Sequence, residues 1–129
     1  MMARILIVDD TPGNMVLTSI MLESEGHTLF CAERALLGID IARRELPDLV
    51  LMDVQMPEMD GIAAVAILKD DPRTRAIPVV ALTAYVMKGD RERMLAAGFD
   101  GYIEKPIDYV SFVAEIRRLV GPQQTSGQE

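Results

Sequence analysis

The residues of this sequence that could carry out chemistry follow short apolar runs of the chain. They are the carboxylates Asp9, Asp10 and Asp53, the hydroxyl of Thr83 and the amine of Lys105. Three carboxylates in one pocket would repel one another, since two unit charges ~4 Å apart cost roughly 4 kcal/mol at an effective dielectric of about 20. A lysine and a hard divalent cation would offset this repulsion, and Mg²⁺ suits the pocket because it binds one or two carboxylates together with phosphate oxygens.

With a metal bound, one of the carboxylates can act as a nucleophile toward a phosphoryl group. Asp53 is the candidate, because it lies alone at the end of the run that we expect at the centre of a sheet. The metal and the ammonium of Lys105 would neutralise charge on the transferred group, and the Thr83 hydroxyl could donate a hydrogen bond to it. The predicted product is an acyl phosphate on Asp53.

Each of these residues also has a purely structural interpretation. Asp9 and Asp10 could form a turn and a helix cap, Asp53 could cap a loop, Thr83 could end a strand and Lys105 could precede a turn. If all of these roles were only structural, residues suited to one site would follow four of the predicted strands by coincidence. Their joint occurrence therefore favours a functional site.

The elements that would position these residues are short strands that alternate with helices. Apolar runs predict strands at Ile5–Val8, Thr28–Cys31, Leu49–Met52, Val79–Leu82 and Tyr102–Ile103. The intervening segments predict helices over Gly13–Glu25, Arg34–Glu45, Asp60–Lys69, Lys88–Ala97 and Asp108–Val120. This alternation predicts an α/β fold with a parallel sheet covered on both faces. In such a sheet ligands bind at the carboxyl ends of the strands, where all the candidate residues would meet.

Length and charge limit the possible functions. The chain has 129 residues and a net charge of -7, which indicates one domain and argues against nucleic acid or an anionic membrane as a direct partner. No apolar run approaches the roughly 18 residues of a membrane span. We expect one domain over residues 1–121 and a polar, disordered tail over 122–129, after a helix stop at Gly121-Pro122.

Three further expectations concern single residues and one helix. The lone Cys31 excludes an intrachain disulfide and favours a reducing, cytoplasmic location, with its thiol in the core; the lone His27 is expected at the surface. In the first helix, Leu17 and Met21 form one apolar stripe while Met15 and Leu22 lie on the opposite side. The additional apolar surface is explained equally well by a docking face and by deeper burial.

Four strings together resemble the receiver domains of two-component response regulators. They are Ile5–Asp10, Asp48–Gly61, Pro78–Ala84 and Tyr102–Pro106, within a resemblance that covers about residues 3 to 120. The second string, Asp-Leu-Val-Leu-Met-Asp-Val-Gln-Met-Pro-Glu-Met-Asp-Gly, is highly specific. The stretches 87–93 and 97–102 are similar to those of DivK-type receivers and of the receivers of hybrid histidine kinases.

The resemblance implies a flavodoxin-like (βα)5 doubly wound sheet with strand order 2-1-3-4-5, and a role for each site residue. Asp53 would be the phospho-acceptor. Mg²⁺, with Mn²⁺ as a possible substitute, would be held by Asp10 directly, by Asp9 mainly through water, by Asp53 and by the backbone carbonyl of Gln55. Lys105 and Thr83 would assist, and Thr83 and Tyr102 would act as the switch. The resemblance also implies a cis bond before Pro106 and an influence of Gln55 and Tyr85 on acyl-phosphate lifetime.

The implied partners are a histidine kinase or histidine phosphotransfer protein and a downstream protein target. The target would contact the face made by helix 88–97, strand 102–103 and helix 108–120. The protein would thus be a self-phosphorylating switch and not an enzyme. The alternatives are a receiver cut from a longer regulator or hybrid kinase, a receiver used only as a scaffold, an FMN carrier, and a phosphatase with an aspartyl nucleophile. The phosphatase would require a second carboxylate at the position of Gln55.

Overall fold

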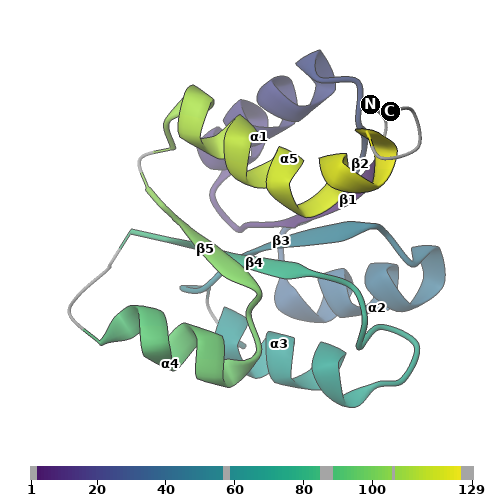
Figure 1. Ribbon diagram of the computed structural model, residues 1–129. Helices are drawn as coiled ribbons and strands as arrows, with labels where there is room; N and C mark the ends of the chain where they lie inside the picture. Colours follow the sequence, from purple (N-terminus) through teal and green to yellow (C-terminus); the bar gives the residue numbers. More distant parts are fainter. Residues whose placement is uncertain (1–2, 57–58, 85–88, 106, 126–129) are drawn as a thin grey trace.

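Strands and helices alternate along the whole described chain (Figure 1). The structure, a computed structural model, describes residues 3–56, 59–84, 89–105 and 107–125. The strands are β1 (Arg4–Val8), β2 (Thr28–Ala32), β3 (Leu49–Asp53), β4 (Val79–Thr83) and β5 (Gly101–Glu104). The helices are α1 (Pro12–Ser24), α2 (Ala35–Glu45), α3 (Gly61–Asp70), α4 (Asp90–Ala97) and α5 (Tyr109–Thr125).

The strands form one parallel sheet in the order β2-β1-β3-β4-β5. Both the predicted α/β class and the predicted strand order are confirmed. Each predicted apolar run lies inside one observed strand. The continuous apolar character of β1, β3 and β4 follows from their position, since an inner strand with helices on both faces buries its side chains; the exception is Arg4, the exposed first residue of β1.

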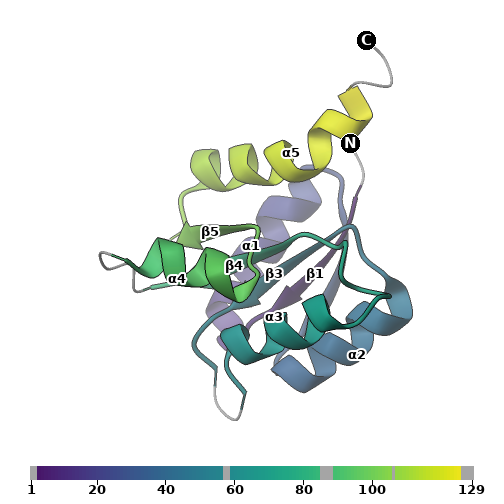
Figure 2. The same cartoon turned by 60° about the horizontal axis from the view of Figure 1, so that its bottom comes forward.

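Helices cover both faces of the sheet. Helices α1 and α5 lie on one face and α2, α3 and α4 on the other (Figures 1 and 2). Successive strand residues point to opposite faces, so Ile5 and Ile7 pack with the α1–α5 layer whereas Leu6 and Val8 pack with the other layer. The sheet is therefore held between two apolar layers, and its carboxyl-terminal edge is left for polar residues.

Local signals define most helix ends as the sequence predicts. Helix α1 ends two residues before Gly26, which adopts a positive φ of 90°. The Oδ1 atom of Asp60 accepts a hydrogen bond from the N–H of Ala63 and caps α3, and Oδ2 of Asp108 accepts one from Ser111. Helix α4 starts at Asp90 instead of Lys88, which lies outside the described residues.

The predicted end of the last helix was wrong. Helix α5 continues through Gly121-Pro122 to Thr125, five residues beyond Val120. A proline within a helix removes its own N–H donor, but its fixed φ is close to the helical value, so the backbone can continue. Residues 126–129 lie outside the described part of the chain, and a disordered tail there stays a prediction.

The structure also corrects the expectations for the two singly occurring residues. Cys31 is exposed, because it lies in β2, an edge strand of the sheet. The Sγ atom of Cys31 lies 3.9 Å from Ser19 Oγ. His27 is buried, and its Nδ1 atom accepts a hydrogen bond of 3.1 Å from the backbone N–H of Ala3. The polar residues around His27 in the sequence gave no sign of this contact with the start of β1.

The apolar surface of α1 is divided between the two interpretations that the sequence left open. Met21 and Leu22 are buried against the sheet. Val16, Leu17 and Ile20 are exposed by 57%, 41% and 60%, so burial does not account for them.

We expect His27 to make stability fall in mild acid. Burial lowers the pKa of the His27 imidazole, although the charge of Glu25 acts in the opposite direction. The unfolded chain, with a histidine pKa of about 6.5, therefore binds more protons than the folded protein just below that pH. The contribution of the neutral, buried imidazole to the free energy of unfolding is complete above the pKa of the unfolded chain. It is lost as the pH falls through the pKa of the folded protein.

The measurement is urea unfolding at pH 7 and pH 5 of the wild type and of His27→Asn, whose side-chain oxygen can still accept from Ala3. The wild type should lose more stability than the variant between the two pH values. An equal loss in both proteins would show that His27 does not contribute.

Candidate metal and phospho-acceptor site

Asp9 continues directly from the buried end of β1. Its side chain is buried, its backbone N–H donates to the carbonyl of Ala32 at 3.0 Å, and its Oδ1 accepts from the N–H of Thr11 at 2.9 Å. Among the described residues, its Oδ2 atom has no hydrogen-bond partner. A buried carboxylate oxygen in this state requires a positive charge nearby.

Asp53 is the last residue of β3, the central strand, and is 3% exposed. Its Oδ1 accepts a hydrogen bond of 3.1 Å from the backbone N–H of Gln55. The backbone beyond it is also fixed, because the N–H of Val54 donates to the carbonyl of Leu82 in β4 at 3.0 Å. The carboxylate is thus held in place at the edge of the sheet.

Lys105 supplies a positive charge to both buried aspartates. Its Nζ atom lies 3.5 Å from Asp9 Oδ2 and 3.4 Å from Asp53 Oδ2. The backbone N–H of Lys105 donates to the carbonyl of Thr83 at 2.7 Å, which ties the segment after β5 to the end of β4. Thr83 itself is buried at the last position of β4.

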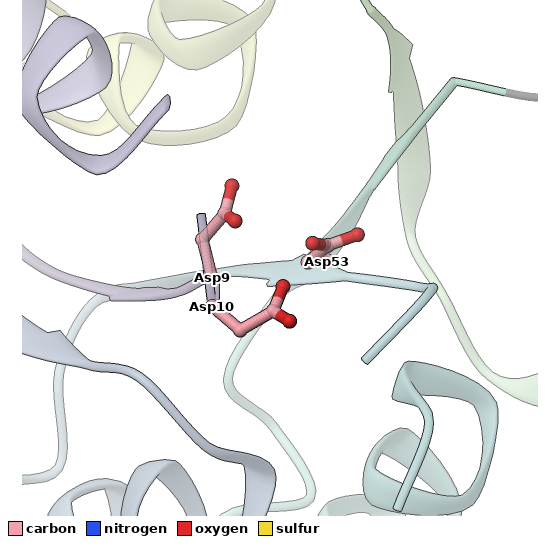
Figure 3. Close-up of side chains that lie close together, drawn as sticks. All are labelled: Asp9, Asp10 and Asp53. Atoms are coloured by element: carbon pink, nitrogen blue, oxygen red, sulfur yellow. The ribbon is translucent and has the colours of Figure 1, made fainter. Parts of the chain in front are cut away.

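Three carboxylates meet at this edge, as predicted. Asp9, Asp10 and Asp53 each place an oxygen within 4.8 Å of the others, at the ends of β1 and β3 (Figure 3). Asp10 is exposed, so the group is open to solvent on one side. A set of hard oxygen donors with one unpartnered buried oxygen fits a small divalent cation such as Mg²⁺.

The protonation of Asp53 reflects its burial more than its acidic neighbours. Burial raises the pKa of Asp53 to about 6; the N–H of Gln55 and the charge of Lys105 act against this, while Asp9 adds to it. Without a cation, the site thus disfavours the ionised form of the residue that is predicted to be the nucleophile.

The other predicted site residues lie around this group. Gln55 is exposed and contributes its N–H to Asp53; the role of its carbonyl as a metal ligand stays a prediction. Tyr102 is partly buried in β5, opposite Ala81 of β4. Pro106, with its predicted cis bond, and Tyr85 lie outside the described residues.

Sequence reasoning gave no role to Gly61, the first residue of α3. A Cβ atom at this position would lie 2.4 Å from the backbone oxygen of Asp53. The available signals were its position directly after the capping Asp60 and its place in the string Asp48–Gly61, and neither indicates a contact with β3.

Comparisons with known proteins agree with this geometry. Residues 5–117 match the family model of the response regulator receiver domain. The chain is 41% identical over 117 residues to the polar-differentiation response regulator DivK of Brucella anthropi, covering 91% of this chain and 95% of that protein. It is 40% identical over 121 residues to DivK of Brucella ovis, covering 94% of this chain and 98% of the relative.

Solved structures are similar over nearly the same length. A receiver domain of a sensor histidine kinase from Pseudomonas aeruginosa, with a magnesium ion coordinated in its active site cleft, is 31% identical. It superimposes with a TM-score of 0.86 and covers 94% of this chain and 99% of its own. A signal receiver domain of a histidine kinase from Syntrophus aciditrophicus is 34% identical with a TM-score of 0.84, covering 93% and 91%.

Without a divalent cation, we expect Asp53→Asn to be more stable than the wild type at pH 7.5. The folded pKa of about 6 lies above the ordinary value of 3.8, so the folded protein holds a proton that the unfolded chain has lost, and stability falls as the pH rises through this range. The difference between the two pKa values corresponds to at most ~3 kcal/mol in the free energy of unfolding. We expect urea unfolding in chelator to show that Asp53→Asn is more stable by about 1–3 kcal/mol.

Two conditions serve as controls. At pH 4 the gap should nearly disappear, because Asp53 is then protonated in the folded wild type. Saturating Mg²⁺ should stabilise the wild type more than the variant, because the cation binds only the folded site. A variant less stable than the wild type in chelator at pH 7.5 would contradict the expected cost of burying the ionised Asp53 carboxylate.

Proposed function

The chain belongs to the response regulator receiver domain family, and from this premise we propose that it accepts a phosphoryl group on Asp53 from a phosphohistidine. The observation that supports this most directly is the buried Asp53 carboxylate with Lys105 Nζ at 3.4 Å and two further carboxylates within 4.8 Å. The protein would serve as the receiver of a two-component phosphorelay and signal through altered protein contacts.

The metal-binding residues in this proposal are Asp9, Asp10, Asp53 and the backbone carbonyl of Gln55. The resident ion would be Mg²⁺, with Mn²⁺ as a substitute that accepts the same oxygen ligands. When bound, the ion would supply positive charge to the carboxylates and to the phosphoryl oxygens. Asp9 Oδ2, buried and lacking a hydrogen-bond partner among the described residues, supports the need for such a charge.

The residues of the chain would carry out the transfer itself. A carboxylate oxygen of Asp53 attacks phosphorus, the bond from phosphorus to the donor histidine nitrogen breaks, and that nitrogen keeps the electron pair. The Lys105 ammonium neutralises charge on the transferred group, and the Thr83 hydroxyl donates a hydrogen bond to one of its oxygens. The backbone N–H of Gln55 keeps the carboxylate oriented during the attack.

The phosphatase alternative lacks the residue that it needs. An aspartyl-nucleophile phosphatase requires a second carboxylate two residues after the nucleophile, and Gln55 stands there. The complete set of acidic residues and lysine argues against a receiver that serves only as a scaffold. We therefore propose a switch that modifies itself over a domain of residues 1–121, either as a separate protein or as part of a longer regulator or hybrid kinase.

The output would pass through the face made by α4, β5 and α5. Thr83 ends β4, Tyr102 lies in the neighbouring β5, and the backbone of Lys105 is bonded to that of Thr83 at 2.7 Å. A movement of Thr83 toward the phosphoryl group, with Tyr102 turning into the vacated space, would change this face and thus its contacts with a downstream protein.

A different surface would contact the phosphodonor. Val16, Leu17 and Ile20 are exposed on α1, which begins two residues after Asp10. A histidine kinase or phosphotransfer protein that covers the site would bury these side chains as well. None of the helices in the described part of the chain could span a membrane. The net charge of -7 does not favour nucleic acid as a partner. We propose protein partners and a cytoplasmic location.

The central experiment is phosphorylation by a small acyl-phosphate donor with Mg²⁺, followed by the mass of the intact protein. The wild type should gain one phosphoryl group, and Asp53→Asn should gain none, because the amide is not a nucleophile. Lys105→Met should slow the reaction by about 10²-fold or more, as expected when a charge aimed at the reacting group is lost. A wild type that gains no phosphoryl mass, or an Asn variant that gains as much, would refute the assignment.

A second measurement follows the proposed switch. Amide hydrogen exchange should change on phosphorylation in β5 and α5, and the change should be absent in Thr83→Ala although the protein still gains the phosphoryl group. Helix α2, which packs against the opposite part of the sheet, provides an internal reference. Equal changes in α2 and in β5–α5 would contradict a signal directed to one face.

A further inference from the structure

The start of α3 lies unusually close to the strand that carries Asp53. A Cβ atom at Gly61 would lie 2.4 Å from the carbonyl oxygen of Asp53 and 2.9 Å from the Cα of Val54. Both neighbours are backbone atoms, so no side chain could rotate away to make room. Gly61 does not adopt a positive φ, and its lack of a side chain is therefore what the site requires.

Hydrogen bonds hold this contact on both sides. The N–H of Gly61 donates to the carbonyl of Val54 at 2.9 Å, and the N–H of Val54 donates to Leu82 in β4 at 3.0 Å. The preceding Asp60 fixes the first turn of α3 through its bond of 2.9 Å from the N–H of Ala63. The peptide after Asp53 is thus clamped between the start of α3 and β4.

This clamp reaches the carboxylate of Asp53 through one more residue. The N–H of Gln55 donates to Asp53 Oδ1 at 3.1 Å, so the backbone of residues 53–55 sets both the origin and the orientation of the side chain. We propose that the Asp60–Gly61 turn is a positioning element for phosphoryl transfer, which keeps Asp53 aligned by holding this backbone against α3. The inference rests on the proposed role of Asp53 as phospho-acceptor.

The expected effect follows from the geometry. Relief of a contact at 2.4 Å to an ordinary distance of about 3.4 Å would move the Asp53–Val54 peptide by roughly 1 Å. A displacement of ~1 Å of a reacting group can reduce a rate by about 100-fold. The saturating rate should therefore fall even when donor and Mg²⁺ are both in excess.

The test compares Gly61→Ala with two matched variants in the acyl-phosphate assay. Gly13→Ala adds the same methyl group in α1, where nothing lies within 4 Å. Leu68→Ala removes a buried side chain at the other end of α3 and lowers stability without touching the site. The saturating phosphorylation rate of Gly61→Ala should fall about 10- to 100-fold, whereas both controls should stay within about twofold of wild type, with stability followed by urea unfolding.

A second pair keeps the test valid if Gly61→Ala does not fold. Asp60→Ala removes the cap of α3, and Asp60→Asn retains an acceptor for the N–H of Ala63. The alanine variant should lower the saturating rate several-fold and the asparagine variant should restore it.

Failure of the inference and failure of the proposed function are distinguishable. A folded Gly61→Ala with the rate of Leu68→Ala, or an Asp60→Ala with the wild-type rate, would overturn the inference alone. A wild type that gains no phosphoryl mass would overturn the proposed function together with it.

Discussion

Repulsion among three carboxylates is the constraint on which the rest of the site depends. Asp9, Asp10 and Asp53 lie within 4.8 Å of one another, and within the described residues Lys105 provides the positive charge that reaches Asp9 and Asp53. Three negative charges against one positive charge leave an excess of negative charge. The pKa of Asp53 is raised mainly by its burial, and the neighbouring Asp9 adds to the rise. Such an arrangement opposes folding by itself, and a divalent cation in the group would offset the repulsion.

The parallel sheet determines where this repulsion occurs. Every strand ends at the same edge, so residues as far apart in the chain as Asp9, Asp53 and Thr83 meet there. Both faces of the inner strands are covered by helices, and polar chemistry is therefore confined to the strand ends. This is why the sequence predicted the α/β class and the acidic group together. Continuous apolar runs identify buried strands, and the polar residues that follow the first, third, fourth and fifth runs identify the edge.

Features that depend on packing between distant elements could not be predicted in this way. The burial of His27 depends on a hydrogen bond to Ala3, and the exposure of Cys31 depends on the position of β2 at the end of the sheet. Gly61 stood inside a recognised string, yet its near contact with Asp53 arises only when α3 packs against β3. Apolar periodicity identifies which residues face a layer, but it contains no information about how closely two backbones approach.

The combination of charge crowding and a rigid backbone explains how such a site can act as a switch. Hydrogen bonds of Gln55, Val54 and Gly61 hold the Asp53 carboxylate and the backbone beside it in place. A change in its charge must therefore be accommodated by the groups that face it. Lys105 is one of these groups, and its backbone bond to Thr83 joins the ends of β4 and β5. A site with a flexible nucleophile would absorb the added charge locally, whereas a fixed one passes the adjustment on to the neighbouring strands.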